Sequence, residues 1–177
     1  MLKNTLTSYG FIAKSFHWLM ALLLICMFCI AYVMINMSDS DFKFSIYDIH
    51  KATGLLLFGL VILRLTWRFI NVQPVLSGIA KWQHFLAKSN LLVLYVLMFL
   101  MPITGFFMST IGGHEITFYG LFTIQPLAHN KDISSIFAEA HTWVSYLLIG
   151  VFSLHVIGAL YHHFILKDNV LRRIWVK

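Results

Sequence analysis

Four long apolar runs constrain this chain more than any other feature of its sequence. They lie at about residues 12–37, 49–70, 91–111 and 138–166, and a helix needs roughly 20 mostly apolar residues to cross a bilayer. A spanning segment must satisfy its backbone hydrogen bonds internally, which favours helices. The sequence therefore predicts an all-α membrane protein, a four-transmembrane-helix bundle in a single domain over residues 1–177. A fifth uncharged stretch, residues 116–128, is too short to span and is predicted to be an interfacial loop.

The composition agrees with a membrane protein. Hydrophobic residues make up 59% of the chain and charged residues only 11%, whereas soluble domains are nearer half apolar and a quarter charged. The formal net charge of +6 is expected to report orientation in the bilayer, so we expect a lipid bilayer and no nucleic acid as a partner. The first apolar run exceeds the length of a signal-peptide core, and no small-residue cleavage site follows it. We interpret it as a retained helix.

Basic and acidic residues alternate between the connections of the predicted helices. The two terminal tails and the second connection carry the basic excess: Lys3, Lys14, Arg64, Arg68, Lys81, Lys88, Lys167, Arg172, Arg173 and Lys177. The first and third connections hold the acidic excess: Asp39, Asp41, Asp48, Glu115, Asp132 and Glu139. Cytoplasmic connections of membrane proteins are enriched in Lys and Arg. Both termini are therefore predicted to be cytoplasmic.

Two histidines in the last apolar run share one helix face. His141 and His155 are fourteen residues apart, which corresponds to a rise of ~21 Å and a rotation that returns to within ~40° of the same direction. The hydrocarbon core of a bilayer is about 30 Å thick. This spacing suits two cofactors stacked through the membrane, one nearer each surface.

Depth along the helices suggests partners for these two histidines. His50 and His141 each follow an acidic residue by two positions, Asp48 and Glu139 respectively. Both acids are expected at the outer interface, so these two histidines should lie at the same depth. His17 lies near the inner end of the first run, and its partner is expected on the inner half of the last run.

Three histidines compete as the partner of His17. His155, His162 and His163 all lie on the inner half of the last run, and His162 shares a face with His155. By depth alone His162 is the better match. A site at that position would lie ~31 Å from His141 along the helix, at the membrane surface, so we favour His155.

Paired neutral imidazoles on different helices suit axial ligation of haem iron, and the core of a helix bundle is a usual place for such a cofactor. Haem propionates need cationic partners. Arg64 follows His50 by fourteen residues, Arg68 lies one turn further, and Lys51 is the nearest cation at the outer end. Arginine presents a fixed fork of donors that suits carboxylates. These three residues are the candidate propionate contacts.

Two alternative interpretations of these histidines do not involve a redox cofactor. The histidines of a non-redox membrane protein can bind zinc, but zinc needs three or four ligands in one small sphere, and four histidines at two depths fit that poorly. His162 and His163 lie near the end of the last apolar run, a few residues before Lys167. For His162 in particular, a quinone or proton-transfer role stands against a role as an interfacial anchor.

The ordered set of motifs resembles the bacterial cytochrome b561 family, whose members include a superoxide oxidase. The resemblance runs through nearly the whole chain and is carried by "HWLMALL", "HKATGLLLFGLVILRLTWR", "LYVLMFLMPITG" and "HTWVSYLLIGVFSLHVIGALYHHFILKDNVLRRI". It implies a multi-pass cytochrome of the bacterial inner membrane with two b haems. His17 and His155 would bind the iron of the inner haem, and His50 and His141 that of the outer one.

The resemblance also implies a function. Electrons pass between the two haems with quinone as a redox partner, and in the superoxide oxidase branch superoxide is the donor and ubiquinone is reduced. The chain is then a membrane oxidoreductase for which no catalytic side chain is assigned. The alternative is a haem b electron-transfer subunit that serves a separate dehydrogenase, hydrogenase or periplasmic cytochrome.

Overall fold

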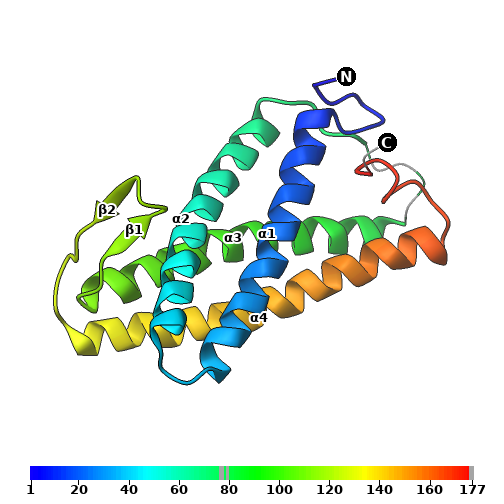
Figure 1. Ribbon diagram of the computed structural model, residues 1–177. Helices are drawn as coiled ribbons and strands as arrows, with labels where there is room; N and C mark the ends of the chain where they lie inside the picture. The colour runs from blue at the N-terminus through cyan, green and yellow to red at the C-terminus, as the bar shows by residue number, and fades with distance from the viewer. Residues whose placement is uncertain (76–77, 79, 176–177) are drawn as a thin grey trace.

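The computed structural model describes residues 1–75, 78 and 80–175; Lys177, counted above among the basic residues of the C-terminal tail, lies outside them. In the described part, four long helices and one hairpin follow one another: α1 (Phe11–Asn36), α2 (Asp41–Phe69), α3 (Lys81–Ile111), β1 (Ile116–Phe118), β2 (Phe122–Ile124) and α4 (Lys131–Phe164). Each of these four helices is long and apolar enough to cross a membrane. The prediction of four long apolar helices is confirmed (Figure 1).

Three of the helices begin seven to ten residues earlier than the apolar runs suggested, at residues 41, 81 and 131 instead of 49, 91 and 138. Their first turns are polar. The Ser40 side chain accepts a hydrogen bond from the backbone N–H of Lys43, and the Asn130 side chain accepts two from the start of α4. Such caps satisfy backbone donors that a helix start leaves free. The helices therefore extend beyond their apolar segments.

The helices form two antiparallel pairs, and the pair α1–α2 lies across the pair α3–α4 (Figure 1). α3 packs closely against α4, and α2 joins the two pairs through its contacts with α3. Two small buried clusters lie within this arrangement: Met20, Val61 and Tyr95 in one, and Leu94, Leu97 and Leu148 in the other. Many other large apolar side chains point outward, as expected when lipid surrounds the bundle.

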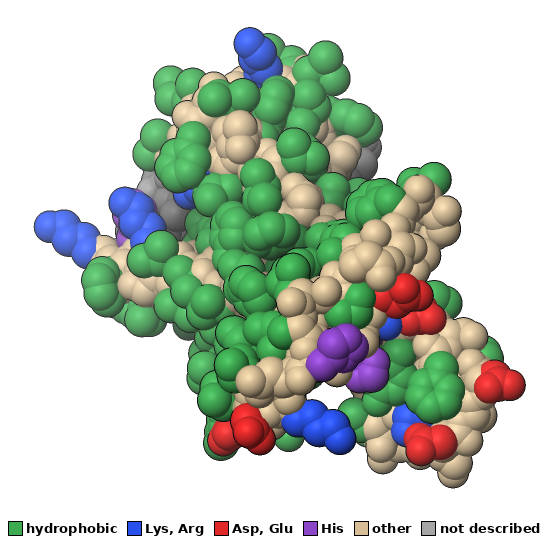
Figure 2. All heavy atoms as spheres, turned by 90° about the vertical axis from the view of Figure 1, so that its left-hand side faces the viewer, with side chains coloured by type: hydrophobic (Ala, Val, Ile, Leu, Met, Phe, Trp, Pro, Cys, Tyr) green, Lys and Arg blue, Asp and Glu red, His purple; other side chains and the backbone are tan. Residues whose placement is uncertain are grey.

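The segment predicted to be an interfacial loop lies between α3 and α4 without forming a helix, and part of it forms the β1–β2 hairpin. Tyr119 and Gly120 turn the chain with positive φ angles of 47° and 76°, the left-handed backbone that tight hairpin turns require. The Tyr119 hydroxyl lies 2.8 Å from the Thr53 hydroxyl of α2. The hairpin is thereby fastened to the bundle. Figure 2 faces this side and shows acidic, basic and histidine side chains gathered around one end of a largely hydrophobic surface.

The chain termini lie together at the opposite end of the molecule (Figure 1). The Trp18 indole Nε1 donates to the carbonyl of Ile174 over 2.9 Å, which holds the C-terminal segment against α1. Val75, in the α2–α3 connection, donates to the carbonyl of Leu6 over 2.9 Å and accepts a hydrogen bond from the Arg173 guanidinium. Both tails and this connection therefore share one end of the bundle.

Candidate functional site

Four histidines form two pairs at different depths of the bundle. His17 of α1 and His155 of α4 have ring centroids 6.2 Å apart, and His50 of α2 and His141 of α4 have centroids 6.5 Å apart. All four side chains are half-buried. We call the first the inner pair and the second the outer pair. The structure thus brings together the residues that the sequence placed at matching depths, with His155 beside His17.

The ring separations suit one metal ion between the two members of each pair. Two imidazoles that bind a metal from opposite sides, each through a bond of about 2.0 Å, have centroids roughly 6 Å apart. Within the described residues, no group of three or more His, Cys, Asp or Glu side chains is arranged to hold a metal ion. Two opposed imidazoles alone leave the remaining coordination positions to a planar ring, so this donor set fits haem iron.

The outer pair has one strongly held member. His141 Nδ1 lies 3.0 Å from the carbonyl oxygen of Met101 and 3.0 Å from the hydroxyl of Thr104, both on α3. A Cβ atom built on Gly105 would lie only 3.0 Å from His141 Cε1, so a side chain here would push against the imidazole. In the sequence, Gly105 follows Pro102 by three residues, and both lie within α3. Their relation to His141 depends on how α3 packs against α4, which no local pattern reports.

The other member of the outer pair has less support. His50 Nδ1 is buried, and no hydrogen-bond partner is found for it among the described residues. The neighbouring Lys51 ammonium pairs with Asp48 over 2.7 Å and donates to the carbonyl of Glu115 over 3.0 Å. Lys51 therefore lies in the first half of α2, and its ammonium group is already paired with Asp48 and the Glu115 carbonyl.

At the inner pair, the guanidinium of Arg64 reaches the histidine itself. Its Nη2 lies 3.1 Å from His17 Nδ1, and its Cζ lies 5.8 Å from the ring centroid of Tyr95. Arg68 is turned away toward the α2–α3 connection, where it donates to the Gln73 side chain over 3.1 Å. Of the two arginines predicted as cofactor contacts, only Arg64 lies against a paired histidine.

A row of aromatic rings leads from the inner pair to the C-terminal segment. Trp18 packs edge-on against His17 with centroids 5.2 Å apart, and Trp175 packs edge-on against Trp18 with centroids 5.4 Å apart. Trp175 in turn lines a cavity of about 570 Å³. The inner pair and this cavity are therefore joined through two indole rings.

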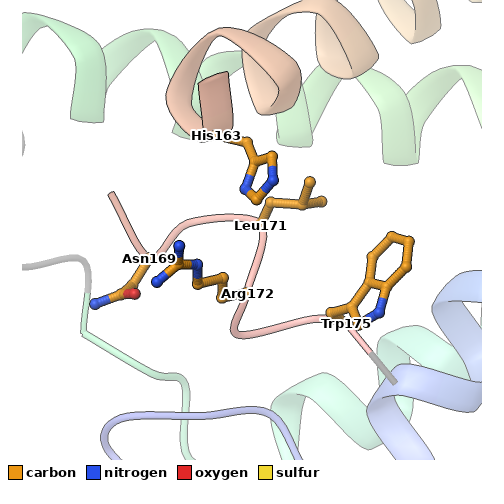
Figure 3. A pocket seen from close by; sticks show the side chains of 5 residues that line it. All are labelled: His163, Asn169, Leu171, Arg172 and Trp175. Carbon is orange, nitrogen blue, oxygen red and sulfur yellow. The ribbon is translucent and has the colours of Figure 1, made fainter. Parts of the chain in front are cut away.

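The cavity, which we call the inner cavity, lies between the end of α4 and the segment that follows it. It is lined by His163, Asn169, Leu171, Arg172 and Trp175. Figure 3 shows His163 extending from α4 toward the loop that carries the other four side chains. His163 Nδ1 is buried, and no described residue offers it a hydrogen-bond partner. The wall therefore combines hydrogen-bond donors with apolar surface.

His162, the residue predicted as a quinone contact, is not among the lining residues of the inner cavity. Its Nδ1 lies 2.5 Å from Asp168 Oδ2. Burial acts to raise the pKa of Asp168, but the hydrogen bonds from His162 and the Val170 backbone, and the charges of His162 and Arg173, outweigh it and leave this pKa below its usual value. The Asp168 carboxylate is thus ionised at neutral pH and fastens the C-terminal segment to α4.

Comparisons with known proteins identify the relatives of this chain. Residues 8–177 match the family described as prokaryotic cytochrome b561. The chain is 32% identical over 173 residues to cytochrome b561 homolog 2 of Escherichia coli K12, an alignment that covers 96% of this chain and 92% of that protein. It is 25% identical over 180 residues to a Yersinia pestis protein named probable superoxide oxidase CybB, with 96% of each chain covered. Cytochrome b561 homolog 1 of E. coli is 28% identical over 131 residues, 71% of this chain and 72% of that protein.

Proposed function

This chain belongs to the prokaryotic cytochrome b561 family, and we propose that it is a dihaem cytochrome that carries electrons from an outer donor to quinone at the inner membrane surface. Membership of the family implies haem b, a cofactor that supplies one-electron redox chemistry when bound. The observation that carries the proposal is the pair of histidine pairs, with centroid separations of 6.2 and 6.5 Å. A protein with a single cofactor has no use for the second pair.

In this proposal each pair holds one haem iron. His17 and His155 bind the inner haem, and His50 and His141 bind the outer one. Because His141 and His155 lie fourteen residues apart on one helix, α4 fixes the two sites at an axial separation of ~21 Å. The bundle therefore holds two redox sites between its outer and inner ends, and an electron can pass from one to the other.

We propose that Arg64 contacts a haem carboxylate at the inner site. Arginine can only donate hydrogen bonds, so its contact with His17 Nδ1 places the proton of the neutral imidazole on Nε2. Ligation through Nε2 requires the proton on Nδ1 instead. Arg64 must then release His17, and a propionate is the partner to which its forked guanidinium is best suited. Arg68 and Lys51 remain candidates for further propionate contacts at the inner and outer ends.

The inner cavity is the proposed site of the quinone ring. Its volume of about 570 Å³ lies within the 300–1,000 Å³ that is usual for small-molecule sites. The carbonyl oxygens of a quinone accept hydrogen bonds, and Arg172, Asn169 and His163 supply donors. Reduction to quinol also consumes two protons, and we propose His162, held by Asp168, as the residue through which they arrive.

We propose superoxide as the outer donor. Support comes from the Y. pestis relative, which is named a probable superoxide oxidase. Two superoxide anions would each give up one electron and leave as O₂, and ubiquinone would take up both electrons and two protons. The outer end is then periplasmic and both termini are cytoplasmic, in agreement with the basic excess on the tails and on the α2–α3 connection.

Purified, haem-loaded protein tests this function directly. Superoxide generated enzymatically should reduce the haem bands and form ubiquinol, and the His50→Ala variant, which should lack the outer haem, should do neither at the same rate. If the wild type binds two haems but forms ubiquinol no faster than a haem-free control, superoxide oxidation is excluded. Stable co-purification with a dehydrogenase, hydrogenase or periplasmic cytochrome would then favour the electron-transfer subunit.

A further inference from the structure

His17, His50 and His141 differ in the groups that lie against their Nδ1 atoms. A carbonyl oxygen can only accept a hydrogen bond. The 3.0 Å contact between the Met101 carbonyl and His141 Nδ1 therefore places the imidazole proton on Nδ1 and leaves the lone pair on Nε2. His141 is held in the tautomer that a metal ligand needs, before any cofactor binds.

The hydroxyl of Thr104 strengthens this arrangement. It lies 2.9 Å from the carbonyls of Leu100 and Met101, so its single proton is used within α3. Its oxygen is then free to accept a share of the Nδ1–H bond from His141 over 3.0 Å. Gly105 completes the contact, because a side chain there would meet the His141 ring. Met101, Thr104 and Gly105 thus all contact one imidazole, while for His50 opposite it the described part of the chain offers Nδ1 no hydrogen-bond partner.

We propose that Met101 and Thr104 make His141 the strongly donating ligand of the outer haem and so place this haem at a lower reduction potential than the inner one. A histidine whose second nitrogen donates to a carbonyl is a more basic ligand, and a more basic ligand favours the oxidised iron. This inference rests on the proposed binding of haem by His50 and His141. Thr104 and Gly105 are positioning residues, because they act through His141.

The charge distribution at the two sites acts in the same direction. The guanidinium of Arg64 lies against the inner pair, and beside a propionate it would offset a carboxylate charge that otherwise favours the oxidised iron. At the outer end the charge of Lys51 is offset by Asp48 at 2.7 Å. Electrons are then drawn inward, toward the aromatic rings that lead to the inner cavity.

The test uses the His155→Ala background, in which the outer haem is the one that should remain. Optical redox titration of this variant is compared with the same protein carrying Thr104→Val, which keeps the shape of the side chain but removes the hydroxyl. We expect the midpoint potential to rise and the affinity for haem to fall about tenfold. Thr104→Ser, which restores the hydroxyl, should return both toward their starting values.

A matched control is available on the same helix. Thr110 is fully buried, and its hydroxyl also bonds to a carbonyl one turn earlier, at Phe106. Thr110→Val should leave the potential unchanged. An unchanged potential in Thr104→Val, or an equal rise in both variants, would overturn the tuning role. Absence of any haem in the His155→Ala background would instead overturn the proposed ligand pairs, so the two failures are distinguishable.

Discussion

His17 and His155 face each other with ring centroids 6.2 Å apart, although they come from the first and last helices of the chain. The helices that carry them do not pack closely along their backbones, whereas α3 and α4 do. The Phe28 and Phe152 rings also meet between α1 and α4, with centroids 6.2 Å apart. A flat cofactor held between the two imidazoles accounts for their separation.

Replacing Arg64 by Gln should weaken the inner haem selectively. Loss of a charged partner for a haem carboxylate is expected to lower its affinity about tenfold, at the lower end of the range for residues that support a metal ligand. Haem content and reduced-minus-oxidised spectra measure the effect. Arg68→Gln is the control, because Arg68 bonds to Gln73, and it should retain the inner haem. Equal losses in both variants would remove Arg64 from the site.

Replacing Trp175 by Leu should raise the KM for ubiquinone and leave the haem content unchanged. The variant loses one edge-on aromatic pair with Trp18, worth about 1 kcal/mol to the attachment of the C-terminal segment, and one wall of the inner cavity. Trp143→Leu is the matched control, since Trp143 is exposed to a similar extent, 61% against 54%. Steady-state kinetics that show the same KM in both variants would place the quinone elsewhere.

The attachment of the C-terminal segment to α4 should depend on pH through Asp168. The pKa of this carboxyl in the folded protein is below its ordinary value of 3.8, so its stabilising effect is full above pH 3.8 and is lost as the pH falls through the lower folded value. Limited proteolysis with an acid-active protease should therefore release the segment only at strongly acidic pH.

The Asp168→Asn variant should release the same segment at neutral pH, since it lacks the charge that His162 and Arg173 favour. Asp132→Asn, at the opposite end of α4, serves as its control. Equal protection of the segment in wild type and Asp168→Asn at neutral pH would show that the contact with His162 contributes nothing to its attachment.

Much of the arrangement could be predicted from the sequence because helix geometry turns spacing into depth. The fourteen residues between His141 and His155 give both an axial distance and a shared face, and the acids before His50 and His141 give a common level. The spanning helices follow from apolar length alone. Their true starts do not, because polar caps such as Ser40 and Asn130 extend a helix beyond the segment that lipid requires.

Other features depend on packing between distant segments. The contact of Thr104 with His141 joins α3 to α4 and has no local signature beyond a nearby proline and glycine. The hairpin consists of two three-residue strands, too short to show an alternating pattern. His162 and His163 are adjacent in sequence, yet one bonds to Asp168 and the other lines the inner cavity. The path of the C-terminal segment decides which of these two histidines bonds to Asp168 and which lines the inner cavity.

The most direct test of the dihaem arrangement compares His141→Ala with His155→Ala. We expect the wild type to bind two b haems per chain. Each variant should retain one haem, and the haems retained should differ in their reduced-minus-oxidised spectra and midpoint potentials. Loss of the same haem from both variants, or a single haem in the wild type, would contradict the two-site arrangement.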